Sequence, residues 1–488
     1  MGRVSRRRFC AAGAGVAAAS LLGRGSLAGE PAAVTLRIGR EMGQVPADFM
    51  GLSYESGQLV NPGFFSGDNR ALVGLFRTLS PGGVLRLGGN LSEFTVWAGD
   101  DVAGDGTART ADPAGADTLV GPDPGHREPR TFTITPTAIR NLRAFLDATG
   151  WRCVYGLNLG GGTVEQALGE GGFVAQTLGP KLVCVQFGNE PDLFKHREQG
   201  GVGWTYEEFL AKWKVFRAAF REKLPSVPVA GPDTAYKQDW FGRFVNDVGK
   251  DIMLSTSHYY TGGPPSNPEM TTEFILHPGK RFEDSCVKAI NSAKAAGLPF
   301  RMAEGNTCYN AGKPGVSDTF ASALWAGDFC LSLATLGCVG VNLHGGAHGY
   351  YSPIVGSITE GFTARPEYYG LRLAQHFSAL SLRETTLDAG GRNITAYAGA
   401  RPGSPGLAVI FNKDADAAVV DVAHENGTGR VHRLVAPALD SKSGVTLAGA
   451  EVGPTGEFSP QGGQAVAARG GKVRVSLPGY SAALIQFE

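Results

Sequence analysis

Two glutamates directly follow short apolar segments of the chain. Glu190 comes after the run 182–187, inside the motif Gly188-Asn189-Glu190-Pro191, and Glu304 comes after the run 300–303. A carboxylate at the polar end of a buried parallel strand is held by a rigid scaffold and stays open to substrate. Two such carboxylates that face each other provide an acid and a nucleophile, the minimum set for cleaving a glycosidic bond.

The motif around Glu190 is the more specific of the two. Pro191 keeps the strand from running on into a helix, and Asn189 offers an amide to a sugar hydroxyl beside the anomeric carbon. The alternative is a surface glutamate in a loop. The position of Glu304 supports it as a catalytic candidate. Glu190 ends the fourth predicted strand and Glu304 the seventh, and these strand ends face each other in a barrel. A retaining glycosidase needs its two carboxyl groups about 5–5.5 Å apart, one protonated and one ionised.

Eight short apolar segments alternate with amphipathic stretches and position these glutamates. The segments are 50–54, 84–87, 153–157, 182–187, 227–230, 253–258, 300–303 and 340–343. Helical spacing of apolar residues marks stretches between them, such as 69–79 and 137–148, and a last helix at 366–377. For the helix after the seventh strand, Ser317 and Asp318 are the expected N-caps and Gly337 the stop. The series predicts an α/β fold, a closed (β/α)8 TIM barrel over residues 46–378.

The sequence pattern changes after residue 377. Short strands at 394–397, 407–411, 418–422, 431–434 and 473–477 are broken by Gly, Pro, Asp and Asn, without helical runs. They predict a C-terminal β-sandwich domain over 379–488. Residues 29–45 join this domain, because the alternating segment Val34–Ile38 reads as an N-terminal strand of the same sheet. The long segment 90–130 follows the second barrel strand, as either a wall of the substrate cleft or a solvated insertion.

The N-terminus is typical of an export signal. Ser5-Arg6-Arg7-Arg8-Phe9 resembles a twin-arginine consensus, and an Ala/Gly/Leu stretch runs to Leu22 before small residues at Ser26-Leu27-Ala28. We expect residues 1–28 to be removed and the protein to be periplasmic or extracellular; a disordered basic N-terminus is the alternative. Elsewhere the chain has no apolar run of about 18 residues, so we expect no membrane span.

Composition narrows the classes of partner. The chain has 488 residues, with 45 Lys+Arg against 45 Asp+Glu, so no global basic field exists to attract nucleic acid. Six of the seven cysteines remain after the signal, and we expect them to be mostly unpaired, since several lie in apolar strands. His344 and His348 have metal-like spacing, but the glycines between them indicate a loop, so no metal and no cofactor is expected. The oligomeric state is left open.

Three segments resemble glycoside hydrolase family 79, which holds bacterial and fungal β-glucuronidases and the animal heparanases. They are 185–192 (Val-Gln-Phe-Gly-Asn-Glu-Pro-Asp), 301–307 (Arg-Met-Ala-Glu-Gly-Asn-Thr) and 316–321 (Val-Ser-Asp-Thr-Phe-Ala). The resemblance covers nearly all of the mature chain. It implies retaining hydrolysis of a β-glucuronide without a cofactor, with Glu190 as acid/base and Glu304 as nucleophile.

The resemblance also implies roles for residues around the nucleophile. Tyr260, at the end of the sixth strand, resembles the tyrosine that hydrogen-bonds the nucleophile and keeps it ionised; a rim aromatic is the alternative. Arg86, at the end of the second strand, would act on the nucleophile electrostatically or form a structural ion pair. Glu55, after the first strand, resembles an acidic residue that holds sugar hydroxyls.

A glucuronide also presents a carboxylate that must be recognised. Tyr309 and Tyr351 resemble the carboxylate-binding tyrosines of the family, and Lys313 would assist them or be a solvated lysine. The segment 305–308 (Gly-Asn-Thr-Cys) departs from the animal heparanases, which carry small hydroxyl residues there. This favours an exo-acting enzyme that releases terminal β-glucuronic acid from glycans or glycoconjugates. The alternatives are another retaining β-glycosidase of the same clan (a xylosidase, a galactosidase or a heparanase-like endo-hydrolase) and a sugar-binding protein without catalysis.

Overall fold

A computed structural model describes residues 33–100, 131–196, 204–277, 279–346, 348–424 and 427–488. The predicted export signal and most of the long segment 90–130 lie outside the described residues. Where that segment is described, it differs from a plain loop. A short 3-10 helix, η2 (Asn90–Phe94), leads into strand β4 (Thr95–Trp97), which pairs in parallel with β5 (Phe132–Ile134).

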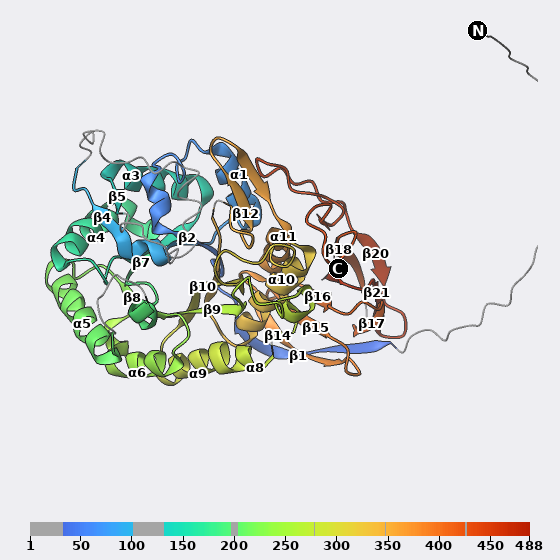
Figure 1. Cartoon of the computed structure of the whole chain (residues 1–488). Helices are drawn as coiled ribbons and strands as arrows, with labels where there is room; N and C mark the ends of the chain where they lie inside the picture. The colour runs from blue at the N-terminus through green and yellow to red at the C-terminus, as the bar shows by residue number, and fades with distance from the viewer. Residues whose placement is uncertain (1–32, 101–130, 197–203, 278, 347, 425–426) are drawn as a thin grey trace, which may run out of the picture.

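The predicted barrel is confirmed (Figure 1). Eight parallel strands close on themselves in chain order, from β2 next to β3 round to β10, β11 and back to β2. The strands are β2 (Met50–Glu55), β3 (Val84–Gly88), β6 (Arg152–Leu157), β7 (Leu182–Phe187), β8 (Val229–Thr234), β9 (Leu254–Gly262), β10 (Phe300–Cys308) and β11 (Gly340–His344). Three of them run well past the predicted apolar segments, because β8 and β9 each continue for four residues and β10 for five.

Helices pack around the barrel with apolar faces turned inward. They are α1 (Arg70–Leu79), α3 (Pro136–Thr149), α4 (Val164–Leu178), α5 (Tyr206–Lys223), α6 (Gln238–Val248), α7 (Thr272–Ile275), α8 (Gly279–Phe282), α9 (Lys288–Ala295), α10 (Phe320–Thr335) and α11 (Pro366–Ala374). Helix α5 shows the local cause. Thr205 and Glu208 form a reciprocal capping box at its start, and the buried Phe209, Trp213 and Phe216 recur at helical spacing.

The start of α10 corrects one prediction. The N-cap is Thr319, whose side chain does not cap the helix, rather than Ser317 or Asp318. The first amides are satisfied from another domain, since Phe320 N–H donates to the Ser441 carbonyl at 2.8 Å. A helix whose donors are met by a tertiary contact needs no capping side chain, and nothing local in the sequence signals this. Gly337, with φ of +81°, ends the helix region as predicted.

The second domain is a ten-stranded sheet that curls around its own apolar core. The strands are β1 (Val34–Gln44), β14 (Ser381–Asp388), β15 (Ile394–Ala400), β16 (Leu407–Asn412), β17 (Ala418–Ala423), β18 (Thr428–Val435), β19 (Thr446–Leu447), β20 (Gln464–Ala467), β21 (Lys472–Leu477) and β22 (Ser481–Phe487). The N-terminal strand β1 lies between β14 and β17, as predicted. Residues from both ends of the sheet share one core, with Leu36, Val420 and Ile485 fully buried, which gives the predicted sandwich.

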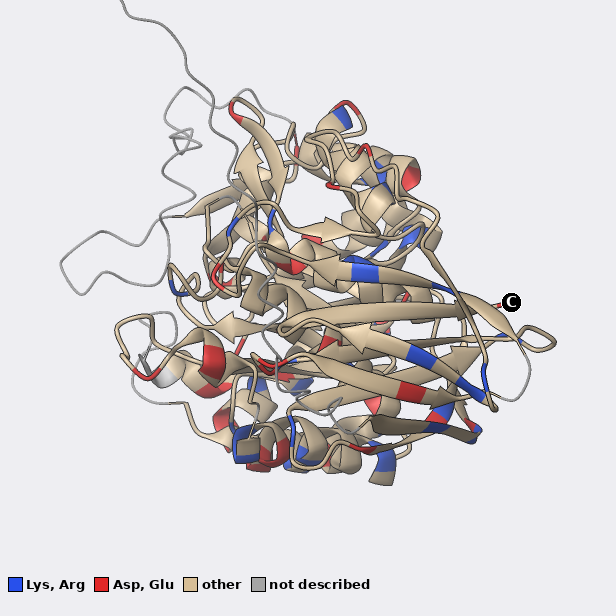
Figure 2. Cartoon of the chain, turned by 90° about the vertical axis from the view of Figure 1, so that its right-hand side faces the viewer, with Lys and Arg blue, Asp and Glu red and all other residues tan. Residues whose placement is uncertain are grey.

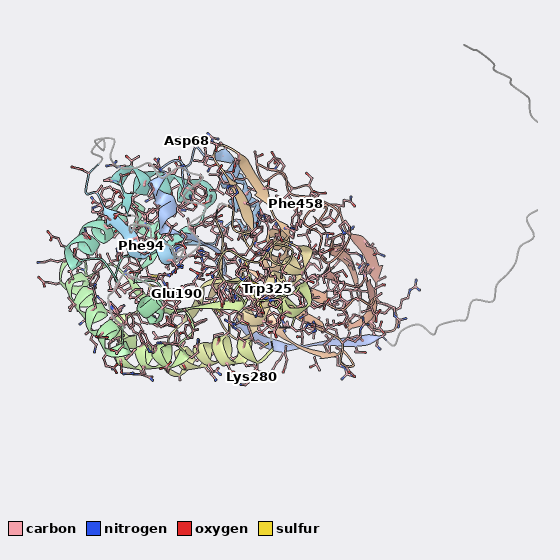
Figure 3. All side chains as sticks on the ribbon, in the orientation of Figure 1. Asp68, Phe94, Glu190, Lys280, Trp325 and Phe458 are labelled. Atoms are coloured by element: carbon pink, nitrogen blue, oxygen red, sulfur yellow. The ribbon has the colours of Figure 1, made fainter. Side chains whose placement is uncertain are left out.

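The barrel and the sheet domain meet at α10 (Figure 3). Trp325, on α10, lies between Glu190 in the barrel and the sheet strands. At this contact Asp328 forms an ion pair with Lys413 at 2.5 Å and accepts hydrogen bonds from Thr395 and Tyr397. A buried carboxylate paired and hydrogen-bonded in this way fixes the two domains in one arrangement.

The distribution of charged residues and the state of the cysteines agree with what the composition suggests. Acidic and basic residues are interspersed along the ribbon in Figure 2, as the formal net charge of +0 suggests. Six cysteines, from Cys153 to Cys338, are buried and free, as predicted. Among the described residues, the helices are all too short or too polar to cross a membrane.

Glu170, a buried residue of α4, makes the free energy of unfolding depend on pH. Burial raises the pKa of Glu170 to about 7, and the hydrogen bond from the Tyr155 hydroxyl (2.6 Å) only partly opposes the rise. The pKa of Glu170 in the folded state lies above the ordinary 4.5. Its contribution to the free energy of unfolding is therefore complete below about pH 4.5 and is lost as the pH rises through 7. When the pH rises from 4 to 8, the free energy of unfolding of the wild type should fall by on the order of 3 kcal/mol relative to that of Glu170→Gln.

Urea unfolding of both proteins across this pH range measures the difference. Glu165→Gln, at an exposed position of the same helix, is the control and should follow the wild-type pH dependence. Parallel stability curves for wild type and Glu170→Gln would contradict the assignment.

Candidate active site

Two irregularities in the barrel sheet aim carboxylates at its centre. The pairing of β8 with β9 shifts register between Pro232 and Thr234, and the pairing of β10 with β9 shifts between Met302 and Glu304. Such bulges turn side chains out of the regular alternation and recur beside active sites. Asp233 at the first bulge has φ of +63°, a left-handed conformation. Glu304 therefore lies within β10 at a bulge, not just beyond the strand as predicted.

The Glu304 carboxylate is surrounded by donors and cations. Tyr260 O–H donates to Oε1 at 2.7 Å and Arg86 Nη1 donates to Oε2 at 2.6 Å, while His344 Nδ1 lies 3.5 Å from Oε2. Burial opposes ionisation, but His344, His258 and Arg86 together hold the pKa of Glu304 well below its usual range. Glu304 is thus a carboxylate at neutral pH, as a nucleophile requires.

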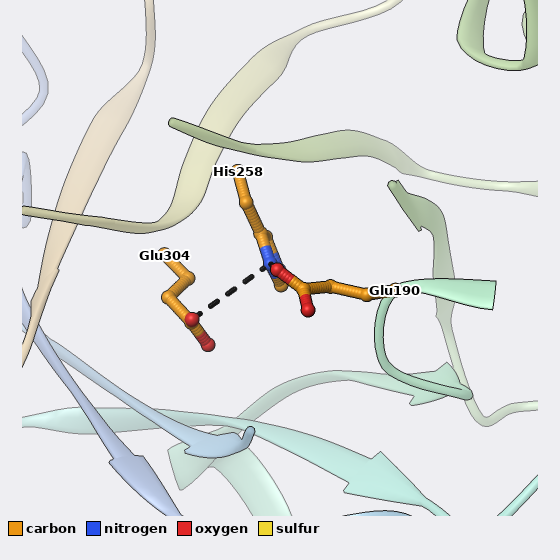
Figure 4. A group of neighbouring side chains, drawn as sticks. All are labelled: Glu190, His258 and Glu304. Atoms are coloured by element: carbon orange, nitrogen blue, oxygen red, sulfur yellow. Dashed lines mark hydrogen bonds and ion pairs between the residues drawn. The ribbon is translucent and has the colours of Figure 1, made fainter. Parts of the chain in front are cut away.

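Glu190 faces Glu304 from the end of β7 (Figure 4). One carboxylate oxygen of each glutamate and a ring nitrogen of His258 all lie within 4.8 Å of one another. This separation is close to that of retaining glycosidases and well short of the 6.5 Å or more of inverting ones. Glu190 is mostly buried and adopts a left-handed φ of +50°, held by a hydrogen bond from its N–H to the Asp233 carbonyl at 2.9 Å.

His258 connects Glu190 to Asp233, and no motif in the sequence predicts a role for either residue. Nδ1 lies 3.0 Å from Glu190 Oε1, and Nε2 lies 3.2 Å from Asp233 Oδ1. Burial disfavours the charged ring, but Asp233 and Glu304 outweigh it and raise the pKa of His258 to about 10. A doubly protonated ring can donate to both carboxylates at once, which a neutral ring cannot do.

Arg86 holds the centre of this network. Its guanidinium is buried, 1% exposed, and reaches acceptors from four segments: Ser53 Oγ (3.1 Å), Asn189 Oδ1 (2.7 Å), Asp233 Oδ2 (2.5 Å) and Glu304 Oε2 (2.6 Å). Burial opposes its charge, but Asp233 and Glu304 raise the pKa of Arg86 above its ordinary value. Arg86 is therefore both a structural ion pair and a cation on Glu304, the two alternatives of the sequence analysis.

The cluster of Glu190, His258 and Glu304 is close enough to share a metal ion. A divalent cation there would have to displace the His258 proton and lie near the Arg86 guanidinium, which already contacts Glu304 at 2.6 Å. These three side chains are therefore better suited to holding and transferring protons than to binding a metal ion.

Part of the chain matches a known family and curated relatives. Residues 206–330 match the model "Glycosyl hydrolase family 79, N-terminal domain". A beta-glucuronidase of Aspergillus niger is 26% identical over 344 residues, covering 64% of this chain and 60% of the relative. One from Neurospora crassa is 28% identical over 321 residues, covering 59% and 54%. The matched region thus spans little more than half the length of these relatives. These matches relate part of the chain to glycoside hydrolase family 79.

Solved structures share the fold of this chain. A 4-O-alpha-L-rhamnosyl-beta-D-glucuronidase from Fusarium oxysporum superposes with a TM-score of 0.73 at 17% identity, over 93% of this chain and 100% of that one. A family 51 arabinofuranosidase from Xanthomonas axonopodis gives 0.67 at 16% identity, over 93% and 100%. At these identities the likeness establishes the barrel with its β-domain.

Two of the predicted substrate-binding residues, Tyr309 and Tyr351, lie beside Tyr260, which donates to Glu304. The ring of Tyr260 lies 6.4 Å from that of Tyr309 and 6.1 Å from that of Tyr351, between centroids. Tyr351 is also 5.8 Å from the ring of His344. Tyr309 and Tyr351 therefore flank the tyrosine that donates to Glu304.

The other three predicted binding residues are already engaged within the protein. Lys313 Nζ donates to the Asn267 carbonyl at 2.7 Å, so one of its three N–H groups is already used within the protein. Asn189 is buried and donates from Nδ2 to Asn90 Oδ1 at 3.1 Å, while its oxygen accepts from Arg86.

The side chain of Glu55 is 27% exposed. It accepts from Leu91 N–H at 2.8 Å and lies 3.7 Å from His344 Nε2. Gly89 permits this placement, because a Cβ there would lie 2.2 Å from the carboxylate of Glu55.

Proposed function

We propose that this protein is a retaining, exo-acting β-glucuronidase. The observation that carries the proposal is the pair Glu190 and Glu304, with carboxylate oxygens within 4.8 Å and surroundings that differ. Glu304 has Tyr260 and Arg86 as donors, which suits a nucleophile, and Glu190 contacts the proton-bearing His258, which suits an acid/base. The names of the curated relatives support the substrate class.

In the first step a Glu304 oxygen attacks the anomeric carbon, and the bond from that carbon to the leaving-group oxygen breaks. Glu190 donates its proton to that oxygen as the bond breaks, so no free alkoxide forms. The Arg86 and Tyr260 hydrogen bonds keep the Glu304 carboxylate ionised before attack. The His258 N–H stabilises the Glu190 carboxylate that results.

In the second step Glu190 acts as a base. It takes a proton from a water whose oxygen attacks the anomeric carbon from the face that the leaving group vacated. The ester bond to Glu304 breaks, Glu304 leaves as a carboxylate, and the sugar is released with its original β configuration. Two inversions at one carbon give net retention.

The carboxylate of a glucuronide would lie at the tyrosines that flank Tyr260. Phenol hydroxyls can hold an anion by hydrogen bonds without a full positive charge. Tyr309 and Tyr351 are in the position for this role, and the tie from Lys313 to the Asn267 carbonyl fixes the neighbouring loop. We infer that Lys313 acts mainly by holding that loop.

Tyr309→Phe should weaken hydrolysis of a glucuronide and spare that of a glucoside. Loss of one hydroxyl that binds the carboxylate should lower kcat/KM for 4-nitrophenyl β-D-glucuronide by about 10- to 100-fold, since hydrogen bonds to charged groups contribute about 1.5–3 kcal/mol. Any activity on the matching glucoside, which lacks the carboxylate, should stay within about threefold. Equal losses on both substrates would show that Tyr309 does not recognise the carboxylate.

A panel of 4-nitrophenyl glycosides tests the proposed function. Wild type should hydrolyse the β-glucuronide and act weakly on the β-glucoside, β-xyloside, β-galactoside and α-arabinofuranoside. A preference for one of the neutral sugars would assign another retaining glycosidase. Binding of glucuronide without release of nitrophenol over long incubation would assign a sugar-binding protein. Mid-chain cleavage of a glucuronic acid polymer would assign an endo-hydrolase.

A further inference from the structure

Glu93 is a buried carboxylate outside the catalytic pair that no step above uses. It lies in η2 (Asn90–Phe94), in the described start of the segment that follows β3, and is 2% exposed. A buried carboxylate needs several donors to offset its loss of water, so its contacts indicate what it holds in place.

Three of the donors to Glu93 are backbone amides at the ends of two other barrel strands. Leu159 and Gly160, after β6, donate to Oε2 at 3.1 and 2.6 Å. Asn189, after β7, donates to Oε1 at 2.7 Å. One side chain thus ties the ends of β3, β6 and β7 together at the face that carries the candidate site.

The surroundings of Glu93 are shaped for this contact. A Cβ on Gly160 would lie 3.0 Å from Oε2, so glycine permits the close approach. Lys212, on α5, donates to the Gly160 carbonyl at 2.8 Å and supplies a positive charge near the carboxylate. Charge-assisted hydrogen bonds from fixed amides hold a loop more firmly than neutral ones.

The amide that Glu93 holds belongs to the residue before Glu190. Glu190 has a left-handed φ of +50°, which a non-glycine residue keeps only where its surroundings enforce it. On one side its N–H donates to the Asp233 carbonyl at 2.9 Å, and on the other Glu93 fixes Asn189. Without the Glu93 contact the backbone that carries Glu190 would have one anchor fewer.

We propose that Glu93 is a positioning residue for Glu190, which clamps the Asn189 amide and so keeps the acid/base carboxyl aimed at the leaving-group oxygen. The inference rests on the proposed function, because it needs Glu190 to be the acid/base. It assigns Glu93 no contact with substrate. Its effect should fall on steps that need proton transfer.

Glu93→Gln tests the clamp, because an amide has one acceptor oxygen and its NH2 group would face a backbone donor. The measurement is kcat/KM for phenyl, 4-nitrophenyl and 2,4-dinitrophenyl β-D-glucuronide, whose leaving groups need decreasing help from an acid. We expect about a 10- to 100-fold loss with the phenyl substrate and less than about threefold with the dinitrophenyl one, since small misplacement of an acid/base is costly only where the acid is needed.

Asp328→Asn is the matched control, a similarly buried carboxylate at the contact between the two domains. It should lower thermal stability while leaving the ratio of the three substrates as in wild type. An equal loss of Glu93→Gln on all three substrates, or no loss, would overturn the inference.

Two further outcomes are separable from these. If Glu93→Gln does not fold, Gly160→Ala displaces the same carboxylate and should steepen the leaving-group dependence; an unchanged dependence overturns the inference. If wild type hydrolyses none of the glucuronides, the proposed function fails, and the inference fails with it.

Discussion

Glu304→Gln is expected to abolish turnover of 4-nitrophenyl β-D-glucuronide, with kcat lowered on the order of 10⁴- to 10⁶-fold, the scale seen when a covalent nucleophile is removed. The amide oxygen of the new side chain still accepts from Arg86, which donates to Glu304 at 2.6 Å, so the fold should persist. Circular dichroism and steady-state kinetics check both statements.

The smaller variant Glu304→Ala provides a chemical control. Added azide can enter the space left by the nucleophile and attack the anomeric carbon once, from the face opposite the leaving group. The product should be the α-glucuronyl azide. Turnover of Glu304→Gln at more than about a hundredth of the wild-type rate, with deamidation excluded by mass spectrometry, would remove Glu304 from the nucleophile role.

Glu190→Ala should separate substrates by leaving group. Phenyl β-D-glucuronide should lose about 10³- to 10⁴-fold in kcat/KM, because its leaving group needs a proton, and 2,4-dinitrophenyl β-D-glucuronide much less. With the dinitrophenyl substrate the glycosyl-enzyme should accumulate, since no base activates water. A burst of dinitrophenol followed by a slow steady rate is the readout.

Azide should restore turnover of Glu190→Ala and give the opposite anomer from Glu304→Ala. Here the anion attacks the glycosyl-enzyme from the vacated face, so the product is the β-glucuronyl azide. Exchange of the two azide products between the variants would reverse the roles of Glu190 and Glu304. The milder Glu190→Gln should mainly slow the second step with activated substrates.

The sequence predicted the scaffold because apolar runs report directly on buried strands. The eight barrel strands lie near the expected segments, and the two glutamates face each other because β7 and β10 are the fourth and seventh strands of a closed barrel. In the sheet domain β14, β19, β20 and β22 were missed. The first, 381–388, is largely polar, and its pairing with β1 comes from tertiary contact.

The polar centre of the site could not be predicted in the same way. Asp233 lies beyond the predicted segment 227–230, and His258 is the last residue of the segment 253–258, so the apolar pattern marks neither as part of a site. Asp233 and Glu304 are turned inward by bulges that leave no trace in composition. One signal was available for His258. It precedes Tyr260 by two residues in a strand, so both side chains share the face that points at Glu304.

The stereochemistry of the first-formed product tests the central claim most directly. Proton NMR of 4-nitrophenyl β-D-glucuronide during rapid hydrolysis by wild type shows which anomer of glucuronic acid appears before mutarotation. Carboxylate oxygens within 4.8 Å of each other predict that the β anomer appears first. Initial appearance of the α anomer would mean a single displacement by water, and Glu304 would then not be a nucleophile.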